Sequence, residues 1–164
     1  MVPGLAVYPG SFDPPTLGHL SLVDQGLTLF DRLVVAVTRN SAKAALFTAE
    51  ERVAMLRAAL ADYDPARVEV DSFEGLLVSY ARSRGATAIL RGLRGSSDFE
   101  YEFQMALVNR HLEPGLQSVY LMTDYRWLYI SSTIVKEVAA YGADIGAMVP
   151  PATARALAEK LRKV

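Results

Sequence analysis

The sequence predicts an α/β fold in which five parallel strands form one doubly wound sheet with helices on both faces. Two observations support this prediction: short apolar runs alternate along the chain with longer stretches of helical period, and several of the runs are apolar throughout. Strands without polar residues are typical of a parallel sheet that is covered on both faces. Strands joined in this alternating order require right-handed crossovers.

The apolar runs place the strands, and the helical periods place the helices between them. Strands are predicted at residues 5–8, 33–37, 68–70, 88–90 and 118–122. Helices are predicted from about residue 17, from residue 48, over residues 76–84, 98–111 and 132–141, and after the two prolines at 150 and 151. Thr48 and Glu51 have the spacing of a capping box, which marks the start of the second helix.

Length and composition fit a single domain over residues 1–164. With 51% hydrophobic residues, the chain can form one sizeable core. It contains no repeat, low-complexity tract or interdomain linker. In such a sheet, ligands bind beyond the carboxyl ends of the strands at a switch point in strand order, so the loop after the first strand is a candidate site.

Charge and cysteine content exclude several kinds of site. The 17 Lys and Arg residues balance 18 Asp and Glu residues, so no overall positive field favours nucleic acid or an anionic membrane. The absence of cysteine excludes disulfides, thiolate nucleophiles and zinc–thiolate sites, and it fits a reducing compartment. No apolar run approaches the roughly 20 residues of a membrane span and no signal peptide is recognised, so a cytoplasmic protein is expected.

The stretch YPGSFDPPTLGH, residues 8–19, has the features of an anion-binding turn between a strand and a helix. Gly10 permits close backbone approach, and the two prolines stiffen the loop. Thr16 can cap the following helix, which puts Gly18 and His19 in a first turn whose N–H groups and dipole favour an anion. The dipole also disfavours an imidazolium, so we expect a neutral His19 that donates to a phosphoryl oxygen. Considered alone, this motif fits a capped turn with a partly buried histidine about as well.

A second stretch, ISST at residues 130–133, opens another predicted helix. Ser131, Ser132 and Thr133 offer hydroxyls and N–H groups to an anion, and two such helix starts suit a polyphosphate. Neither G-x-x-x-x-G-K-[ST] nor a G-x-G-x-x-G after a strand is present, which disfavours a P-loop kinase and a dinucleotide-dependent dehydrogenase.

The two stretches together resemble the paired motifs of the nucleotidyltransferase superfamily, T/H-x-G-H and I-S-S-[ST]. Within that superfamily the chain resembles the phosphopantetheine adenylyltransferases over essentially its whole length, through YPGSFDPPTLGH, LFTAEER, RGLRGSSDFEYEFQMALVNRHL and ISSTIVKEVA. This resemblance implies a Rossmann-like fold, ATP and 4′-phosphopantetheine as substrates, and dephospho-coenzyme A and pyrophosphate as products. It also implies Mg²⁺ carried by ATP, for which no protein ligand is named, and a homohexamer.

Adenylyl transfer requires a protein that positions two anions and stabilises charge on the transferring group. The resemblance assigns His19 to the α-phosphate in the transition state and Lys43, which follows the second strand, to the acceptor phosphate. On residue type alone, a solvated loop lysine is the more usual interpretation of Lys43. The residues that the resemblance places at ATP are Ser11, Phe12, His19, Gly92, Leu93, Arg94, Glu102, Trp127, Leu128, Tyr129, Ile130, Ser131, Ser132 and Thr133. Those that it places at the acceptor are Ser11, Lys43, Leu77 and Arg91.

Other interpretations of these side chains remain open from the sequence. A bare Arg-x-x-Arg, here Arg91 and Arg94, more often pairs with nearby carboxylates. The candidates are Asp98, Glu100 and Glu102. Asp98 and Glu102, which are four residues apart, either orient the arginines or reach the ribose. A lone tryptophan usually packs in a core, and Leu77 fits an ordinary apolar helix position. Four residues at helical spacing are predicted to belong to the core rather than to the site: Phe99, Phe103, Ala106 and Leu107.

Two other functions also fit part of the sequence. Another nucleotidyltransferase, such as a nicotinamide mononucleotide adenylyltransferase or a cytidylyltransferase, shares the loop chemistry but not the RGLR…DFEYE block. A nucleotide-binding module without turnover is the alternative from a different class. The presence of His19, Lys43 and both serines of the second motif argues against it.

Overall fold

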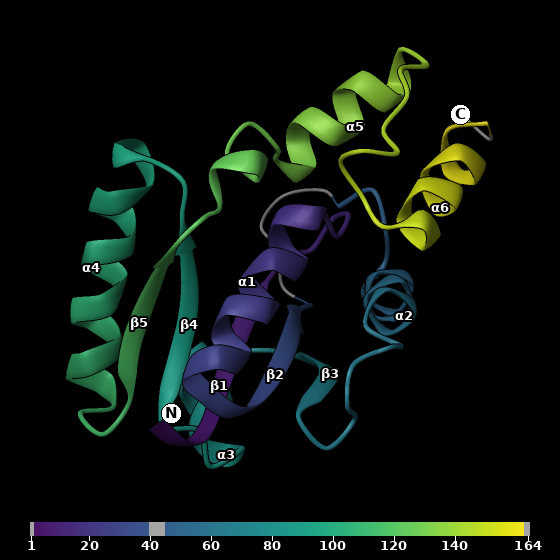
Figure 1. The fold of residues 1–164 in the computed structure, drawn as a ribbon. Coiled ribbons are helices and arrows are strands. Elements are labelled where there is room, and N and C mark those ends of the chain that lie inside the picture. Colours follow the sequence, from purple (N-terminus) through teal and green to yellow (C-terminus); the bar gives the residue numbers. More distant parts are fainter. Residues whose placement is uncertain (1, 40–44, 163–164) are drawn as a thin grey trace.

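The computed structural model describes residues 2–39 and 45–162, which form a five-stranded parallel sheet with helices on both faces (Figure 1). The strands are β1 (Val2–Gly10), β2 (Phe30–Thr38), β3 (Val68–Phe73), β4 (Ala88–Leu93) and β5 (Gln117–Met122). Their order in the sheet is β3-β2-β1-β4-β5, and every pair is parallel. The predicted doubly wound, Rossmann-like class is therefore confirmed, and chain order reverses between β1 and β4.

The predicted helices are all present, with ends that differ by a few residues. They are α1 (Leu17–Leu29), α2 (Ala49–Ala59), α3 (Leu77–Ser83), α4 (Ser96–Leu112), α5 (Ser132–Ala140) and α6 (Pro151–Leu161). Thr16 and Thr48 cap α1 and α2 as predicted, each in a capping box. The sequence did not predict the short 3-10 helix η1 (Tyr125–Trp127). Among the described helices, none is long and apolar enough to span a bilayer.

The core has one apolar layer on each face of the sheet. Helices α1 and α2 cover the face that carries Tyr8 and Leu33, whereas α3 packs on the opposite face against Val7 and Val34. Helix α4 lies on this second face, where Glu102 is in contact with Tyr120 of β5. Because strand side chains alternate between faces, Arg91 at the end of β4 points toward α4.

Close packing fixes α1 on the sheet. A Cβ atom on Gly26 would lie 2.7 Å from Leu90 Cδ2 and 2.9 Å from Leu33 Cδ1. A Cβ atom on Gly92 would lie 2.3 Å from Leu22 Cδ1. Because neither position has room for a side chain, the helix approaches β2 and β4 closely and its first turn has a defined place above the strand ends.

The last two helices form a third cluster beyond the carboxyl ends of the strands (Figure 1). Buried residues from α5 and α6 pack there against Phe47 and Met55. The Leu17 N–H, at the first position of α1, donates to Met148 O over 2.9 Å. This packing brings the ISST motif next to the first loop, where Ser132 contacts Pro14 although the two residues are 118 apart in the sequence.

The structure contradicts the prediction that Phe99, Phe103 and Leu107 belong to the core. These side chains are 55%, 52% and 55% exposed, and the rings of Phe99 and Phe103 stack on the outer surface. The opposite side of α4 carries two buried polar residues, Glu102 and Asn109, whose spacing of seven places them on one face. The helical spacing correctly indicated that these three residues share one side of α4, but it could not show which side of the helix faces the sheet.

Candidate active site

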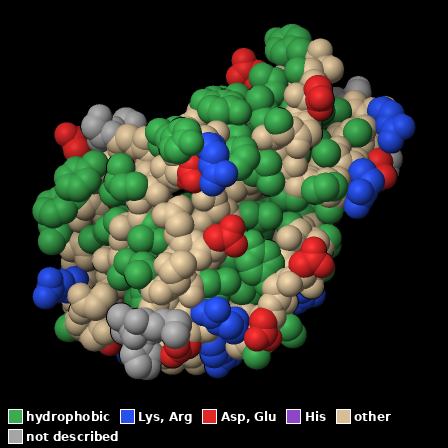
Figure 2. Space-filling view, viewed as in Figure 1, with side chains coloured by type: hydrophobic (Ala, Val, Ile, Leu, Met, Phe, Trp, Pro, Cys, Tyr) green, Lys and Arg blue, Asp and Glu red, His purple; other side chains and the backbone are tan. Residues whose placement is uncertain are grey.

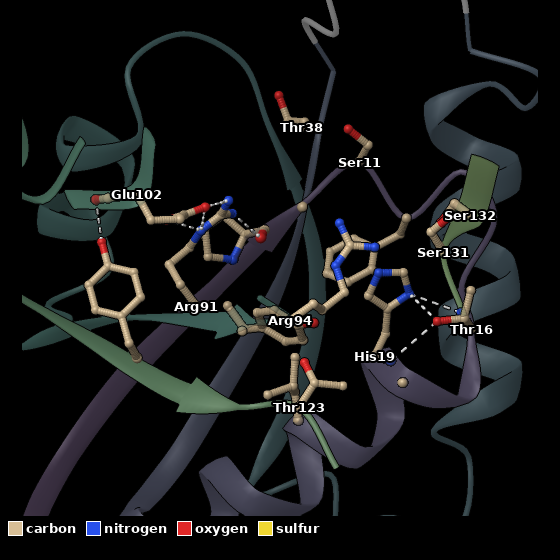
Figure 3. Close-up of a pocket in the computed structure, with 18 of the residues that line it drawn as sticks. Ser11, Thr16, His19, Thr38, Arg91, Arg94, Glu102, Thr123, Ser131 and Ser132 are labelled. Carbon is tan, nitrogen blue, oxygen red and sulfur yellow. Dashed lines mark hydrogen bonds and ion pairs between the residues drawn. The ribbon is translucent and has the colours of Figure 1, made fainter. Parts of the chain in front are cut away.

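A cavity of about 540 Å³ opens at the carboxyl ends of the strands, where β1 and β4 lie side by side (Figure 3). This is the switch point in strand order, the usual ligand position in such folds. The cavity is lined by the β1–α1 loop, the ends of β4 and β5, one side of α4, and the segment from η1 into α5.

Most of the predicted site residues meet at this cavity. Those that line it are Ser11, Phe12, His19, Leu77, Arg91, Gly92, Arg94, Glu102, Trp127, Ile130, Ser131, Ser132 and Thr133. Leu128 and Tyr129 line a smaller pocket beside it, together with Arg94 and Ser131. Leu93 is part of β4 but lines neither pocket. Lys43 lies outside the described residues, so its predicted role remains a prediction.

The hydrogen bonds of His19 determine which of its ring nitrogens carries the proton. The Thr16 N–H donates to His19 Nδ1 over 2.9 Å, and a backbone N–H can only donate, so Nδ1 must be an unprotonated acceptor. The Thr16 hydroxyl lies 3.1 Å from the same nitrogen. A neutral His19 therefore carries its proton on Nε2, where it is available as a donor to a ligand in the cavity.

His19 is also held in its neutral form. Burial and, as a smaller contribution, the charge of Arg94, whose guanidinium lies beside the ring in Figure 3, together lower the pKa of His19 to about 4. The ring of Phe12 packs edge-on against the imidazole with ring centroids 5.0 Å apart. The structure thus supports the expected neutral imidazole, with its donor nitrogen specified.

We expect an NMR titration of the free protein to give His19 a pKa near 4, with the proton of the neutral ring on Nε2. The exposed His111 serves as the internal reference. Because the folded-state pKa of His19 lies below the unfolded value of about 6.5, the unfolded chain binds the proton more tightly. Its contribution to stability is therefore complete above about pH 6.5 and is lost as the pH falls toward 4. A His19 pKa above 6 would contradict this account.

Phe12 has an unusual backbone that places its ring. Its φ is 48°, in the left-handed region that non-glycine residues seldom adopt. The side chain is 2% exposed and lies between Tyr8, with ring centroids 5.3 Å apart, and His19. Phe12 was predicted as an ATP residue; its ring supports the imidazole, which leaves its backbone to face a ligand.

Two helix N-termini offer donors at the cavity. At α1, the Leu17 N–H donates to Met148 O, and the His19 N–H donates to Thr16. Of the hydrogen bonds within the described residues, none is donated by the Gly18 N–H. The Gly18 N–H and the His19 Nε2–H are therefore two donors that the first motif can offer to an anion.

At α5 the two serines differ in their roles. Ser131 Oγ accepts from the Ile134 N–H over 3.1 Å and caps the helix, which leaves its hydroxyl proton free to donate. The Ser132 hydroxyl instead donates to Pro14 O over 2.8 Å. The sequence predicted that both hydroxyls would be offered to an anion, but the Ser132 proton joins the second motif to the first loop, and its backbone N–H remains as a donor.

Both arginines of the RGLR block pair with carboxylates, as the alternative interpretation expected. Arg91 forms a fork with both oxygens of Glu102 and also donates to Pro9 O over 3.1 Å. Burial acts to lower the pKa of Arg91, but the hydrogen bond and charge of Glu102 outweigh it and raise the pKa. Arg94 pairs more loosely with Asp98, at 3.4 Å and on an exposed side chain. Asp98 and Glu102 therefore orient the arginines.

The sequence missed several residues of the cavity. Arg52, 2% exposed, donates to Ser11 O over 2.6 Å and to Thr38 O over 3.1 Å and so fixes the loop from below. Burial raises the pKa of Tyr8, which keeps its hydroxyl protonated. Arg52 does not itself line the cavity; besides Tyr8, the unpredicted lining residues are Pro9, Leu22, Thr38, Phe73, Tyr101, Met105, Asn109, Tyr120 and Thr123. The ends of the predicted strands were a signal for Thr38 and Thr123; the α4 residues had none.

The site and fold together define a nucleotidyltransferase. The model of the cytidylyltransferase-like family matches residues 7–138. Two solved structures share the fold at low sequence identity: a putative nicotinate-nucleotide adenylyltransferase from Vibrio parahaemolyticus (TM-score 0.66, 17% identity, 96% of this chain and 99% of that one), and a bifunctional NMN adenylyltransferase/ADP ribose pyrophosphatase from Francisella tularensis (TM-score 0.72, 14% identity, 98% and 51%).

Curated relatives narrow this class to one family. A phosphopantetheine adenylyltransferase from Nitratidesulfovibrio vulgaris is 55% identical over 95% of this chain and 83% of its own length. The corresponding proteins from Desulfosudis oleivorans and Geotalea daltonii are 53% and 49% identical, over 96% and 97% of this chain and 92% and 98% of their own. The chain belongs to the phosphopantetheine adenylyltransferase family.

Proposed function

We propose that this chain transfers the adenylyl group of ATP to 4′-phosphopantetheine, giving dephospho-coenzyme A and pyrophosphate. The observation that carries the proposal is that two helix N-termini and a neutral histidine with its proton on Nε2 face one cavity. Such an arrangement suits a polyphosphate whose α-phosphoryl group gains negative charge during transfer. The activity named for the relatives that are about half identical supports the same reaction.

The proposed chemistry is a single in-line displacement. An oxygen of the acceptor phosphate forms a bond to the α-phosphorus of ATP while the bond from that phosphorus to the bridging oxygen of the β-phosphate breaks, and pyrophosphate leaves with the electron pair. His19 Nε2–H and the Gly18 N–H stabilise charge on the non-bridging oxygens. A phosphate monoester is already a nucleophile, so no protein base is needed. Glu102 is accordingly engaged with Arg91 and not poised as a base.

The two substrates divide the cavity between them. We place the adenosine and triphosphate against Arg94, Trp127 and the start of α5, where the smaller pocket adjoins the cavity. We place the acceptor against Arg91 and Leu77, which line the part of the cavity formed by β4 and the start of α3. Ser11 belongs to both, because it lies in the loop between them.

Mg²⁺ enters the proposal as part of the ATP complex that is bound. Among residues 2–39 and 45–162, no group of three or more His, Asp or Glu side chains is placed to hold a metal ion. Among the described residues that line the cavity, the charged side chains are Arg91, Arg94 and the already paired Glu102. The ion is therefore assigned to the triphosphate oxygens and solvent rather than to a protein cage.

We also propose that the chain assembles as a homohexamer, as predicted from the family resemblance. The exposed surface of α4 supports this proposal, because six large apolar side chains of this helix, of which Tyr101 also lines the cavity, are each at least 48% exposed: Phe99, Tyr101, Phe103, Leu107, Val108 and Leu112. Figure 2 shows hydrophobic side chains gathered along this edge of the molecule. Exposed large apolar side chains gathered on one helix are typical of an interaction surface. Sedimentation velocity should give a hexamer for the wild type and smaller species for Phe103→Lys; a monomeric wild type would contradict the proposal.

An acceptor panel tests the proposed reaction. Pyrophosphate release is measured from ATP with 4′-phosphopantetheine, nicotinamide mononucleotide and a phosphorylated alcohol, and from CTP with the same acceptors. We expect release only with ATP and 4′-phosphopantetheine, with dephospho-coenzyme A as the second product. Preference for a mononucleotide or for CTP would favour the related nucleotidyltransferases, and nucleotide binding without any release would favour the non-catalytic module.

Replacing Lys43 with alanine should weaken phosphopantetheine binding by about tenfold while ATP binding changes little, the scale expected for losing a charge-assisted contact to the acceptor phosphate. Calorimetric titration of each substrate measures this. Lys160→Ala, which removes a lysine that pairs with Glu51 away from the cavity, is the control. Equal losses for both substrates would show that our division of the site is wrong.

A further inference from the structure

A buried ion pair outside the cavity lining joins the two motifs. Asp13, in the loop between β1 and α1, is 6% exposed. Its Oδ2 accepts from Lys136 Nζ over 2.8 Å and from the Leu46 N–H over 3.0 Å, and its Oδ1 accepts from the Phe47 N–H over 2.9 Å. Neither Asp13 nor Lys136 lines the cavity, so the proposed chemistry assigns them no contact with a substrate.

The pair lies close to both anion-binding helix starts. Asp13 precedes by three residues Thr16, which caps α1, and Lys136 lies one turn beyond Ser132, the first residue of α5. The neighbouring Pro14 O accepts the Ser132 hydroxyl over 2.8 Å. Asp13 and Pro14 of the first loop thus bind Lys136 and Ser132 on one face of α5. These contacts set the separation and angle of the two helix starts.

The surroundings of Asp13 favour its ionised carboxylate. Burial acts to raise the pKa of Asp13, but the hydrogen bond from Lys136 and those from the Phe47 and Leu46 N–H groups outweigh it and lower the pKa. A buried ion pair often adds little net stability, because desolvation offsets the attraction. Its retention at this point is better explained by the geometry that it imposes than by the stability that it adds.

We infer that Asp13 and Lys136 are positioning residues, which align the N-termini of α1 and α5 so that both bind the same polyphosphate. The inference rests on the proposed function, because it supposes that one ligand spans both motifs. Without the pair, the first loop can shift relative to α5 while each helix keeps its own cap. His19 and the N-terminus of α5 at Ser131 would then no longer contact the same transferring group at the same time.

The molecule provides a matched control pair. Lys160 of α6 donates to both oxygens of Glu51 over 2.9 Å each, joining α6 to the first turn of α2. This bond has the same chemistry and nearly the same lysine exposure, 31% against 30% for Lys136. The ion pair itself joins neither the first loop nor α5. Lys160 Nζ also lies 5.4 Å from the centroid of the Phe47 ring, but the Phe47 group that donates to Asp13 is a backbone N–H, so removal of Lys160 should affect stability without changing the alignment of the helix starts.

The test is a double-mutant cycle in steady-state kinetics with ATP and 4′-phosphopantetheine. Asp13→Asn, Lys136→Met, their combination, Lys136→Arg and the control Lys160→Met are compared well below their melting temperatures. We expect Lys136→Met to lower kcat by about tenfold or more, the cost of misplacing reacting groups by a fraction of an ångström. The KM for ATP should rise less than kcat falls, Lys136→Arg should restore most of the rate, and Lys160→Met should retain the wild-type rate.

The cycle distinguishes positioning from a general loss of stability. Asp13→Asn and Lys136→Met should not be additive in kcat, because either one removes the same pair. If Asp13→Asn does not fold, the comparison of Lys136→Met and Lys136→Arg with Lys160→Met still tests the inference, since the Lys136 side chain is partly exposed. A kcat for Lys136→Met equal to that of Lys160→Met, or two fully additive losses, would overturn the inference.

The wild-type rate is measured first, so failure of the proposed function is recognised separately. If the wild type does not transfer an adenylyl group, the pair is judged by calorimetric titration with MgATP alone. Lys136→Met should then bind it at least about threefold more weakly than Lys160→Met, because one of the two helix starts no longer reaches the polyphosphate. Equal affinities would overturn the inference in that case too.

Discussion

Replacing His19 with alanine is expected to lower kcat by about a hundredfold or more, the scale for losing one transition-state donor. The neutral ring carries its proton on Nε2 because Nδ1 accepts from Thr16, and this donor is best placed for charge that develops during transfer. The loss should therefore appear in kcat, with little change in ATP affinity. Steady-state kinetics and calorimetry on the same preparation measure both quantities.

The second histidine gives the matched control. His111 lies near the end of α4, is exposed and is remote from the RGLR block along the helix, so His111→Ala should retain the wild-type rate. Thermal unfolding of His19→Ala confirms that the fold persists. A near-normal kcat, or an effect confined to KM, would remove His19 from its role at the transferring group.

Replacing Arg91 with alanine is expected to have the largest effect on stability among the site residues. The change leaves the Glu102 carboxylate, on a side chain 9% exposed, without its charged partner. Breaking such a pair from one side costs about 3 kcal/mol of unfolding free energy, which corresponds to a fall in Tm of roughly 6 to 12 °C for a chain of this size. Acceptor binding should also weaken, because Arg91 lines the acceptor part of the cavity.

A double variant separates these two effects. In Arg91→Met/Glu102→Met no buried charge is left unpaired, so most of the lost stability should return. Acceptor binding should remain weak, because the guanidinium is still missing. If the single variant loses less than about 1 kcal/mol, the pair is not the buried ion pair that we describe.

The fold was largely predictable because its signals are local. Apolar strands, the helix cap at Thr16, the capping box at Thr48 and the alternating order of elements are each visible within a short stretch of sequence, and each was confirmed. The exposed stripe of α4 was not predictable in this way. Phe99 and Phe103 look like core residues by spacing, and only the presence of Glu102 on the sheet-facing side shows that they point outward.

The site was predictable where a motif is contiguous and missed where contacts join distant segments. His19 and Ser131 belong to short motifs whose chemistry follows from a helix start. Asp13, Arg52 and Lys136 were missed, because the contacts that join them to other segments of the site span 14 to 123 residues and charged side chains are ordinarily exposed. No pattern within one stretch indicates that such a charge is buried or what it holds.

The most direct test of the account concerns the number of displacements at the α-phosphorus. A two-step route needs a protein nucleophile; the chain has no cysteine, and His19 Nε2 carries a proton in the neutral ring. ATP made chiral at the α-phosphorus with sulfur is turned over with 4′-phosphopantetheine, and the configuration of the dephospho-coenzyme A analogue is determined. One direct in-line transfer predicts inversion. Retention of configuration, or isolation of an adenylylated protein, would contradict the account.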